Sequence, residues 1–187
     1  DDRGHMNAVQ DVNTIKRINE KSPATCYSCK SSNNPALWDQ MGMEAYDAML
    51  FSDMKPNIEY SIGCANCHEA GTMRLIVTNP ALENALNAQG KDWTTFTRQE
   101  MRTVVCANCH VEYYFAGDKK FLTCPWEDGT RIDQIIKYYN DLGFKDWEYP
   151  ETGIPMLKAQ HPEYEMFTAG STHYNAGVSC ADCHMPY

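Results

Sequence analysis

Eight of the nine cysteines in the 187-residue sequence form four pairs, and two residues separate the thiols of each pair. Thiols at this spacing can each add to a vinyl group of haem, and the residue after the second thiol then lies beneath the iron. That residue is histidine in three pairs and lysine in the first. The four sites are Cys26, Cys29 and Lys30; Cys64, Cys67 and His68; Cys106, Cys109 and His110; and Cys180, Cys183 and His184. The pattern predicts four covalently attached haems c.

Zinc is the main alternative, because paired cysteines at this spacing also form zinc sites. A zinc site does not need a histidine directly after the second cysteine, whereas a haem iron needs an axial ligand there. A disulfide framework fits poorly, because repeated three-residue cysteine loops are not the usual bridges of small secreted domains. The ninth cysteine, Cys124, is expected to be a small buried hydrophobic side chain.

Lys30 occupies the position of an iron ligand, although lysine binds metals reluctantly. Its amine is largely protonated below a pKa of ~10.4 and must lose that proton before it can bind. A lysine on one face of a haem, with no protein ligand on the other, would leave the iron open to a substrate. The alternative is an ordinary surface lysine beside an electron-transfer haem whose iron has two other ligands.

The composition limits the functional classes. A formal net charge of −9 and the absence of a basic run argue against nucleic-acid binding. We find no secretory signal and no apolar segment near the ~20 residues needed to cross a bilayer. Covalent haem attachment nevertheless implies a compartment outside the cytoplasm. We therefore expect a periplasmic protein whose signal has been removed and whose sequence here is incomplete.

Hydrophobic spacing predicts a mainly helical chain. Asn79 and Pro80 are expected to start one helix and Gly90 to close it. No segment alternates as a strand would, and the haems are expected to supply much of the apolar core. The fold class is therefore a mainly α multihaem c-type cytochrome, with helices and long loops around closely packed haems and little or no strand, in a single domain over residues 1–187. The helices are expected at 9–18, 36–51, 81–88, 97–105, and along a face made of Ile132, Ile135, Ile136 and Tyr139.

Three motifs, together with the order of the haem sites, make the sequence resemble the pentahaem cytochrome c nitrite reductases, the ammonia-forming enzymes. The motifs are Cys-Tyr-Ser-Cys-Lys at 26–30, Cys-Ala-Asn-Cys-His-Val-Glu-Tyr-Tyr-Phe at 106–115, and Pro-Met-Leu-Lys-Ala-Gln-His-Pro-Glu-Tyr-Glu at 155–165. The resemblance covers essentially the whole chain. It implies the reduction of nitrite to ammonium with six electrons and eight protons.

The resemblance also assigns the residues of the reaction site. Lys30 is implied to be the proximal ligand of the catalytic haem, and Arg17, Tyr113 and His161 are implied to line the distal pocket. Arg17 and His161 would hydrogen-bond the nitrite oxygens, and Tyr113 would supply a proton or a hydrogen atom. Without the resemblance, Arg17 would be read as a cation at the C-terminal end of helix 9–18.

Two further sets of ligands follow from the resemblance. The side chains of Glu112 and Gln160, with the backbone carbonyls of Tyr113 and Lys158, are implied to bind calcium, a hard cation that prefers oxygen donors. His5 is implied to be the distal ligand of the third haem, and His173 that of a fifth haem. Taken alone, His5 would be read as a surface histidine near a frayed terminus.

The family has features that this sequence lacks. A fifth Cys-x-x-Cys-His motif and the histidines that complete the second and fourth haems do not occur here, so the sequence resembles the middle of a catalytic subunit. The resemblance further implies a homodimer. It implies electrons from a quinol-oxidising membrane multihaem cytochrome or from a soluble multihaem donor.

Two other functions remain open at this point. A non-enzymatic electron carrier would have two protein ligands on every iron. A related multihaem enzyme would act on hydroxylamine or a sulfur oxyanion. A high-spin haem that responds to nitrite or cyanide would distinguish an enzyme from a carrier, and comparative turnover would distinguish the substrates.

Overall fold

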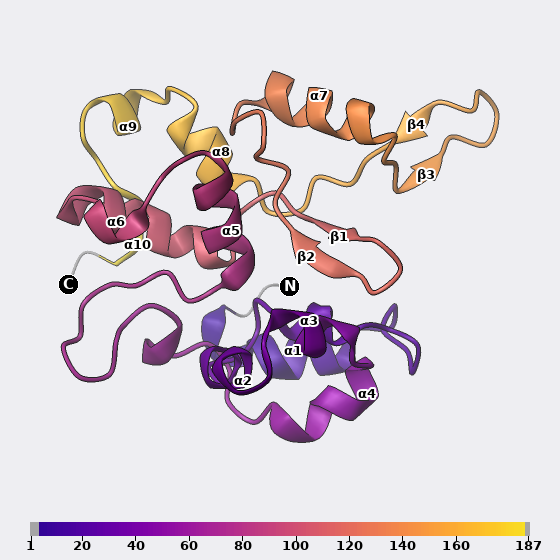
Figure 1. Ribbon diagram of the computed structural model, residues 1–187, viewed down its shortest axis with the longest axis horizontal. Helices are drawn as coiled ribbons and strands as arrows, with labels where there is room; N and C mark the ends of the chain where they lie inside the picture. Colours follow the sequence, from indigo (N-terminus) through magenta and orange to yellow (C-terminus); the bar gives the residue numbers. More distant parts are fainter. Residues whose placement is uncertain (1–3, 186–187) are drawn as a thin grey trace.

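The computed structural model describes residues 4–185 and gives a mainly helical chain, as the sequence predicts (Figure 1). Residues 1–3 and 186–187 of the predicted domain lie outside the described residues. The α-helices are α1 Ala8–Thr14, α2 Asn34–Met41, α3 Met43–Ala48, α4 Phe51–Met54, α5 Pro80–Ala88, α6 Arg98–Val104, α7 Ile132–Leu142, α8 Glu163–Thr168, α9 Thr172–Asn175 and α10 Cys180–His184. In residues 4–185, no helix combines the length and the hydrophobicity needed to cross a bilayer.

The remaining regular structure is short. Two antiparallel hairpins are present, in which β1 (Tyr114–Ala116) pairs with β2 (Phe121–Thr123) and β3 (Trp147–Glu148) pairs with β4 (Pro155–Met156). The 3₁₀ turns are η1 His5–Asn7, η2 Ala24–Tyr27, η3 Lys55–Asn57, η4 Cys64–Asn66, η5 Trp93–Thr95 and η6 Val105–Asn108. Three of these turns contain cysteines of the predicted haem sites.

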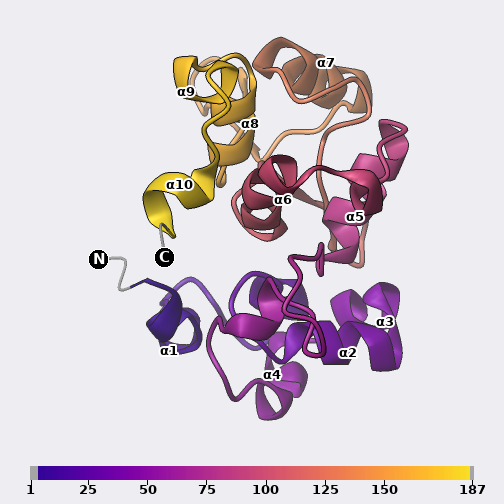
Figure 2. The ribbon, with the colours of Figure 1, turned by 90° about the vertical axis from the view of Figure 1, so that its left-hand side faces the viewer.

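Helices α1–α4 gather on one side of the molecule, and α5–α10 with the β1–β2 hairpin lie on the other side (Figures 1 and 2). Each side has its own buried cluster. Tyr27 and Tyr46 are fully buried in the first, and Leu82 and Trp126 are fully buried in the second. Cys124 belongs to the second cluster and is buried, which confirms the expectation for the ninth cysteine.

The prediction of one helix over residues 36–51 is wrong. Gly42 has a φ of 78°, a left-handed conformation that favours glycine, and it separates α2 from α3. Met49 is extended and ends α3, and its carbonyl accepts a hydrogen bond from the Ala24 N–H (2.9 Å). The Phe51 N–H donates to the Ser22 carbonyl at 2.7 Å. The breaks therefore fold this region back onto the segment that precedes the first cysteine pair.

The first helix is also shorter than predicted. It ends at Thr14 rather than at residue 18, because Ile15 takes an extended conformation with a ψ of 122°. Arg17 consequently lies in a turn closed by the hydrogen bond from Ile18 N–H to the Ile15 carbonyl (3.2 Å). It is not a cation of the last helical turn, so its side chain is available to another part of the molecule.

Helices α5 and α6 confirm the predicted positions. The Asn79 side chain accepts a hydrogen bond from the Ala81 N–H at the start of α5. Gly90, with a φ of 68°, follows the end of that helix. Thr97 caps α6 together with Glu100, and the chain then tightens into η6, which carries the third cysteine pair.

The predicted apolar face of α7 is only half correct. Ile135 and Tyr139 are each 3% exposed, whereas Ile132 is 72% exposed and Ile136 is 42% exposed. The two buried side chains pack with Tyr114 of β1, because the helix lies along the segment that follows the third cysteine pair. The buried stripe is therefore narrower than the sequence spacing suggests.

Asp47 of α3 provides a prediction on stability. Its buried carboxylate accepts a hydrogen bond from the Leu122 N–H (3.0 Å), and burial raises its pKa from 3.8 to about 6. The folded state therefore binds this proton more tightly than the unfolded chain does. The resulting stabilisation is fully present below pH 3.8 and is lost as the pH rises through about 6.

We expect the stability of Asp47→Asn to fall less than that of the wild type as the pH rises, because an amide oxygen still accepts a hydrogen bond from Leu122 but carries no charge. Thermal unfolding of the complete protein on either side of pH 6 would measure it. Asp39→Asn, at an exposed position of α2, is the matched control. An unchanged pH dependence in Asp47→Asn would mean that another group is responsible.

Candidate haem and substrate site

The second and third cysteine pairs share a local fold that places the following histidine beside the thiols. In the second and third pairs, the histidine N–H donates to the carbonyl of the first cysteine, from His68 to Cys64 at 2.8 Å and from His110 to Cys106 at 2.9 Å. None of the nine cysteines, all of which lie within residues 4–185, forms a disulfide, so the paired thiols are available for thioether bonds.

The third pair contacts both the first pair and the fourth pair. The thiol of Cys29 lies against that of Cys109, and it also lies 3.9 Å from the carbonyl of Asn108. The thiol of Cys106 lies against that of Cys180 and lowers the pKa of Cys180 to about 7. Residues more than 70 positions apart in the sequence therefore bring three predicted haem sites into contact, as the expectation of closely packed haems requires.

The imidazole of His68 is oriented for metal binding. Its Nδ1 lies 2.7 Å from the Met73 carbonyl, so Nδ1 carries the proton and donates it. Nε2 is then left as the unprotonated nitrogen, which is the usual arrangement of a histidine that binds a metal through Nε2.

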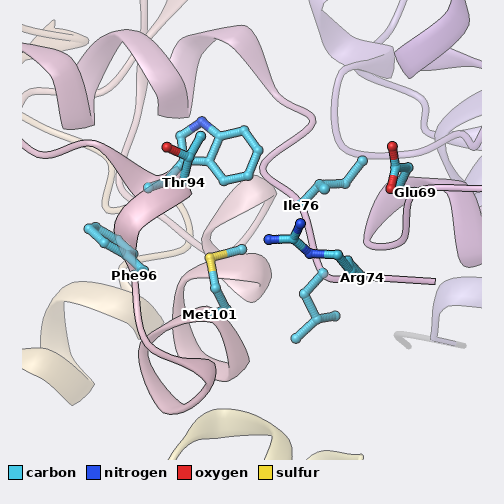
Figure 3. Close-up of a pocket in the computed structure, with 8 residues that line it drawn as sticks. Glu69, Arg74, Ile76, Thr94, Phe96 and Met101 are labelled. Carbon is cyan, nitrogen blue, oxygen red and sulfur yellow. The ribbon is translucent and has the colours of Figure 1, made fainter. Parts of the chain in front are cut away.

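A hollow of about 240 Å³ lies beside the second pair, between residues 69–76 and η5–α6. In Figure 3, the Arg74 side chain extends across the hollow toward Met101. Trp93 and Phe96 add apolar walls. The lining therefore combines apolar walls with one cation, Arg74, and one carboxylate, Glu69.

His5 and His110 face each other at a separation that suits a metal between them. Their ring centroids are 6.3 Å apart and the rings are tilted by 52°. An ion bound to one nitrogen of each ring, with bonds of ~2.0 Å, would hold the centroids roughly 6 Å apart. Burial lowers the pKa of His110, which favours the neutral imidazole that binds metals. The residues present therefore fit the iron of the third haem.

Tyr113 and Arg17 come together beside the first cysteine pair. Burial raises the pKa of Tyr113, the nearby thiols of Cys29 and Cys26 raise it further, and the charge of Arg17 opposes this shift. Arg17 also acts on Cys26, whose pKa is raised by burial and lowered by Arg17 and Lys30. Three of the four predicted catalytic residues therefore contribute to one electrostatic environment.

His161, the fourth predicted catalytic residue, lies beside the third haem site. Its ring centroid is 6.1 Å from that of His110, and the two rings are nearly perpendicular, at 77°. Only two residues separate His110 from Tyr113, so the same segment links His161 to the first site. His173 of α9 and His184 of α10 are exposed, and their predicted roles as haem ligands remain predictions.

Glu112, a predicted calcium ligand, is a buried carboxylate without a nearby cation among its described contacts. Its Oε2 accepts from the Gln160 N–H (2.8 Å) and its Oε1 accepts from the Tyr139 hydroxyl (3.1 Å). Burial raises the pKa of Glu112, and the charge of Asp146 raises it further. Asp146 also accepts from the N–H of Lys158, another predicted ligand. The carboxylates of Glu112 and Asp146, both close to the backbone of residues 158–160, fit a site for a divalent cation.

Residues 160–165 are held against residues 110–112 by further contacts that the sequence does not reveal. The Tyr164 N–H donates to the His110 carbonyl at 3.1 Å. Glu165 Oε1 accepts from the Glu112 N–H (2.9 Å) and from the Trp126 indole (2.7 Å). Burial raises the pKa of Glu165 to about 7. These bonds position His161 and Glu112 relative to the third cysteine pair.

Asn108 connects the cysteine pairs through its buried side chain. Its Oδ1 accepts from the backbone N–H groups of Thr78 and Asn79, both at 3.0 Å. Its Nδ2 donates to the Val105 carbonyl (3.0 Å) and to the Asn66 carbonyl (3.3 Å). The available signal in the sequence was the repetition of Cys-Ala-Asn-Cys at 64–67 and 106–109.

Comparison with known proteins places this arrangement in a family. The sequence model of the cytochrome c552 family matches residues 1–187. The chain belongs to the cytochrome c552 family. Haem c, the cofactor predicted from the cysteine pairs, is therefore confirmed.

Curated cytochromes c-552 are similar over nearly the whole chain. The protein from Parabacteroides distasonis is 46% identical, and the match covers 99% of this chain and 39% of the relative. The cytochrome c-552 of Maridesulfovibrio salexigens is 41% identical, with 99% and 40% covered. The chain thus spans about two fifths of the length of these cytochromes c-552.

A solved structure agrees with the family assignment. The catalytic subunit (NrfA) of the cytochrome c nitrite reductase from Desulfovibrio desulfuricans ATCC 27774, described with two calcium sites, is 39% identical. It superposes with a TM-score of 0.88 and covers 99% of this chain and 44% of that chain. The predicted resemblance and the mainly helical cytochrome fold are confirmed.

Proposed function

We propose that the complete protein reduces nitrite to ammonium at the haem attached to Cys26 and Cys29, with Lys30 as the proximal ligand. The meeting of Arg17 and Tyr113 beside the cysteine pair that ends in lysine carries this proposal. The description of the solved relative as a nitrite reductase supports the choice of substrate. When bound, this haem supplies an open iron position for nitrite and the route by which electrons arrive.

The side chains of the pocket bind the substrate and move protons. Arg17 places a positive charge, and His161 a hydrogen-bond donor, where negative charge develops on the nitrite oxygens as the N–O bonds break. Tyr113 keeps its proton at neutral pH, as tyrosine ordinarily does, and burial raises its pKa further. Its hydroxyl therefore acts as a donor, and it supplies a proton or a hydrogen atom.

Calcium is proposed to bind beside this pocket. The donors are the side chains of Glu112 and Gln160 and the backbone carbonyls of Tyr113 and Lys158. A cation there would balance the buried charge of Glu112 and fix the backbone that carries Tyr113. The calcium sites in the description of the solved relative support this assignment.

The cellular setting is part of the proposal. Covalent haem supports a location in the periplasm, where a quinol-oxidising membrane multihaem cytochrome or a soluble multihaem donor would supply electrons. The family resemblance supports a homodimer. The net charge of −9 argues against nucleic acid as a partner class.

Lys30→His in the complete protein tests the proposal. We expect the haem to remain attached, the axial ligand to change, and nitrite turnover to fall by about tenfold or more, because the donor to the reacting iron has changed. Haem content, electron paramagnetic resonance with and without nitrite, and steady-state turnover measure this. Lys21→His, at an exposed position, is the matched control.

Unchanged turnover in Lys30→His would contradict the proposal. So would an oxidised wild-type protein in which every haem is low-spin and none responds to nitrite or cyanide. That second result would indicate an electron carrier.

A further inference from the structure

Glu163 lies between the two histidines that belong to different parts of the proposed site. Its Oε2 is 3.6 Å from Nδ1 of His110, and its Oε1 is 3.6 Å from Nδ1 of His161. One ligand atom from each of the three side chains lies within 4.8 Å of the others. One carboxylate therefore faces the same nitrogen of both imidazoles, with one oxygen directed to each.

The chain holds this carboxylate in place through its backbone. Glu163 is the first residue of α8, and the next residue, Tyr164, donates its N–H to the carbonyl of His110 (3.1 Å). Glu165, two residues on, accepts from the Glu112 N–H. The start of α8 is thus fixed against residues 110–112, and the side chain of Glu163 reaches both histidines from one fixed position.

A carboxylate beside Nδ1 favours the proton on that nitrogen and leaves Nε2 unprotonated. For His110, the free Nε2 is then available to the iron between His110 and His5, whose centroids are 6.3 Å apart. For His161, the same preference leaves Nε2 as the nitrogen that faces the proposed substrate pocket. An exposed ion pair would have little effect on the stability of the fold. A carboxylate that orients a metal ligand nevertheless changes the basicity of that ligand and the reduction potential of the metal.

We propose that Glu163 is a positioning residue that orients both His110, as a ligand of the third haem, and His161, in the substrate pocket. This inference rests on the proposed function and adds a shared anion that links an electron-transfer haem to the reaction site. Loss of the carboxylate would disturb both histidines together.

Glu163→Gln in the complete protein, with all haems attached, tests the inference. The amide has nearly the same shape but no charge, so it does not impose one tautomer on either ring. We expect one low-spin haem to shift to a higher reduction potential, because its histidine becomes a weaker donor. We also expect a decrease of about tenfold in kcat for nitrite. Spectroelectrochemical titration and steady-state kinetics measure the two effects separately.

Two variants serve as controls. Glu163→Asp keeps the charge with a shorter reach and should restore part of both effects. Glu151→Gln, in the exposed loop between β3 and β4, removes a carboxylate elsewhere and should change neither. Haem content should equal that of the wild type in all three variants.

The outcomes separate the inference from the function on which it rests. If Glu163→Gln leaves both the potentials and kcat unchanged, the inference is overturned. A shifted potential with an unchanged kcat would overturn the link to His161. A loss of activity that added zinc or calcium reverses would mean that the three side chains hold a cation, which also overturns it. If the wild type does not reduce nitrite, the proposed function fails, and the potential shift still tests Glu163.

Discussion

Replacing His161 with asparagine in the complete protein should lower nitrite turnover by about 10²- to 10³-fold. Asparagine can still form a hydrogen bond, but it cannot transfer a proton near neutral pH as an imidazole can. The ring of His161 lies 6.1 Å from that of His110, so the change also removes a neighbour of this predicted haem ligand. Steady-state kinetics with nitrite, expressed as kcat and kcat/KM, measure the loss.

The haem content and the spectrum of the oxidised protein are the controls for His161→Asn. Both should match the wild type, because the fold holds residues 160–165 through the backbone and through Glu165 rather than through His161. Loss of haem in the variant would show that His161 has a structural role. Turnover within a factor of about two of the wild type would show that His161 does not take part in catalysis.

Asn108→Ala should destabilise the folded protein strongly, because one side chain satisfies several buried backbone groups. The Asn108 side chain is 3% exposed and bonds two backbone N–H groups, those of Thr78 and Asn79. Its amide also bonds the carbonyls of Val105 and Asn66. Each buried polar group left without a partner costs about 1–3 kcal/mol, so we expect a total loss of roughly 3 kcal/mol or more.

Thermal unfolding and the yield of fully haem-loaded protein measure the effect of Asn108→Ala. Asn140→Ala, at an exposed position of α7, is the matched control and should change the midpoint little. A midpoint for Asn108→Ala equal to that of Asn140→Ala would mean that water or a haem replaces the lost bonds.

The haem-attachment sites of this chain could be predicted from its sequence because the residues of each site are only a few positions apart. A thiol, a second thiol and an imidazole at fixed offsets need no tertiary structure to be recognised, and the same holds for the cap at Asn79. The break at Gly42 was missed because the apolar residues on both sides continue the helical spacing. Only the pairing of residues 49–51 with residues 22–24 explains why the chain turns there.

Other features were hidden because they depend on distant residues. Strands β1 and β2 have three residues each, too few to show an alternating pattern. Ile132 and Ile136 have the spacing of buried residues, yet the helix buries only the side that faces Tyr114. The roles of Glu163 and Asn108 arise from partners 53 and 29 positions away, respectively, and no local pattern records them.

The contact between Cys29 and Cys109 has a consequence for how the protein is made. Each of these sulfurs is predicted to bond to a vinyl group of a different haem, and two thiols in contact leave no room for a porphyrin edge between them. The porphyrins must therefore be joined before this part of the chain closes, so that assembly of the holoprotein runs from attachment to folding and not the reverse.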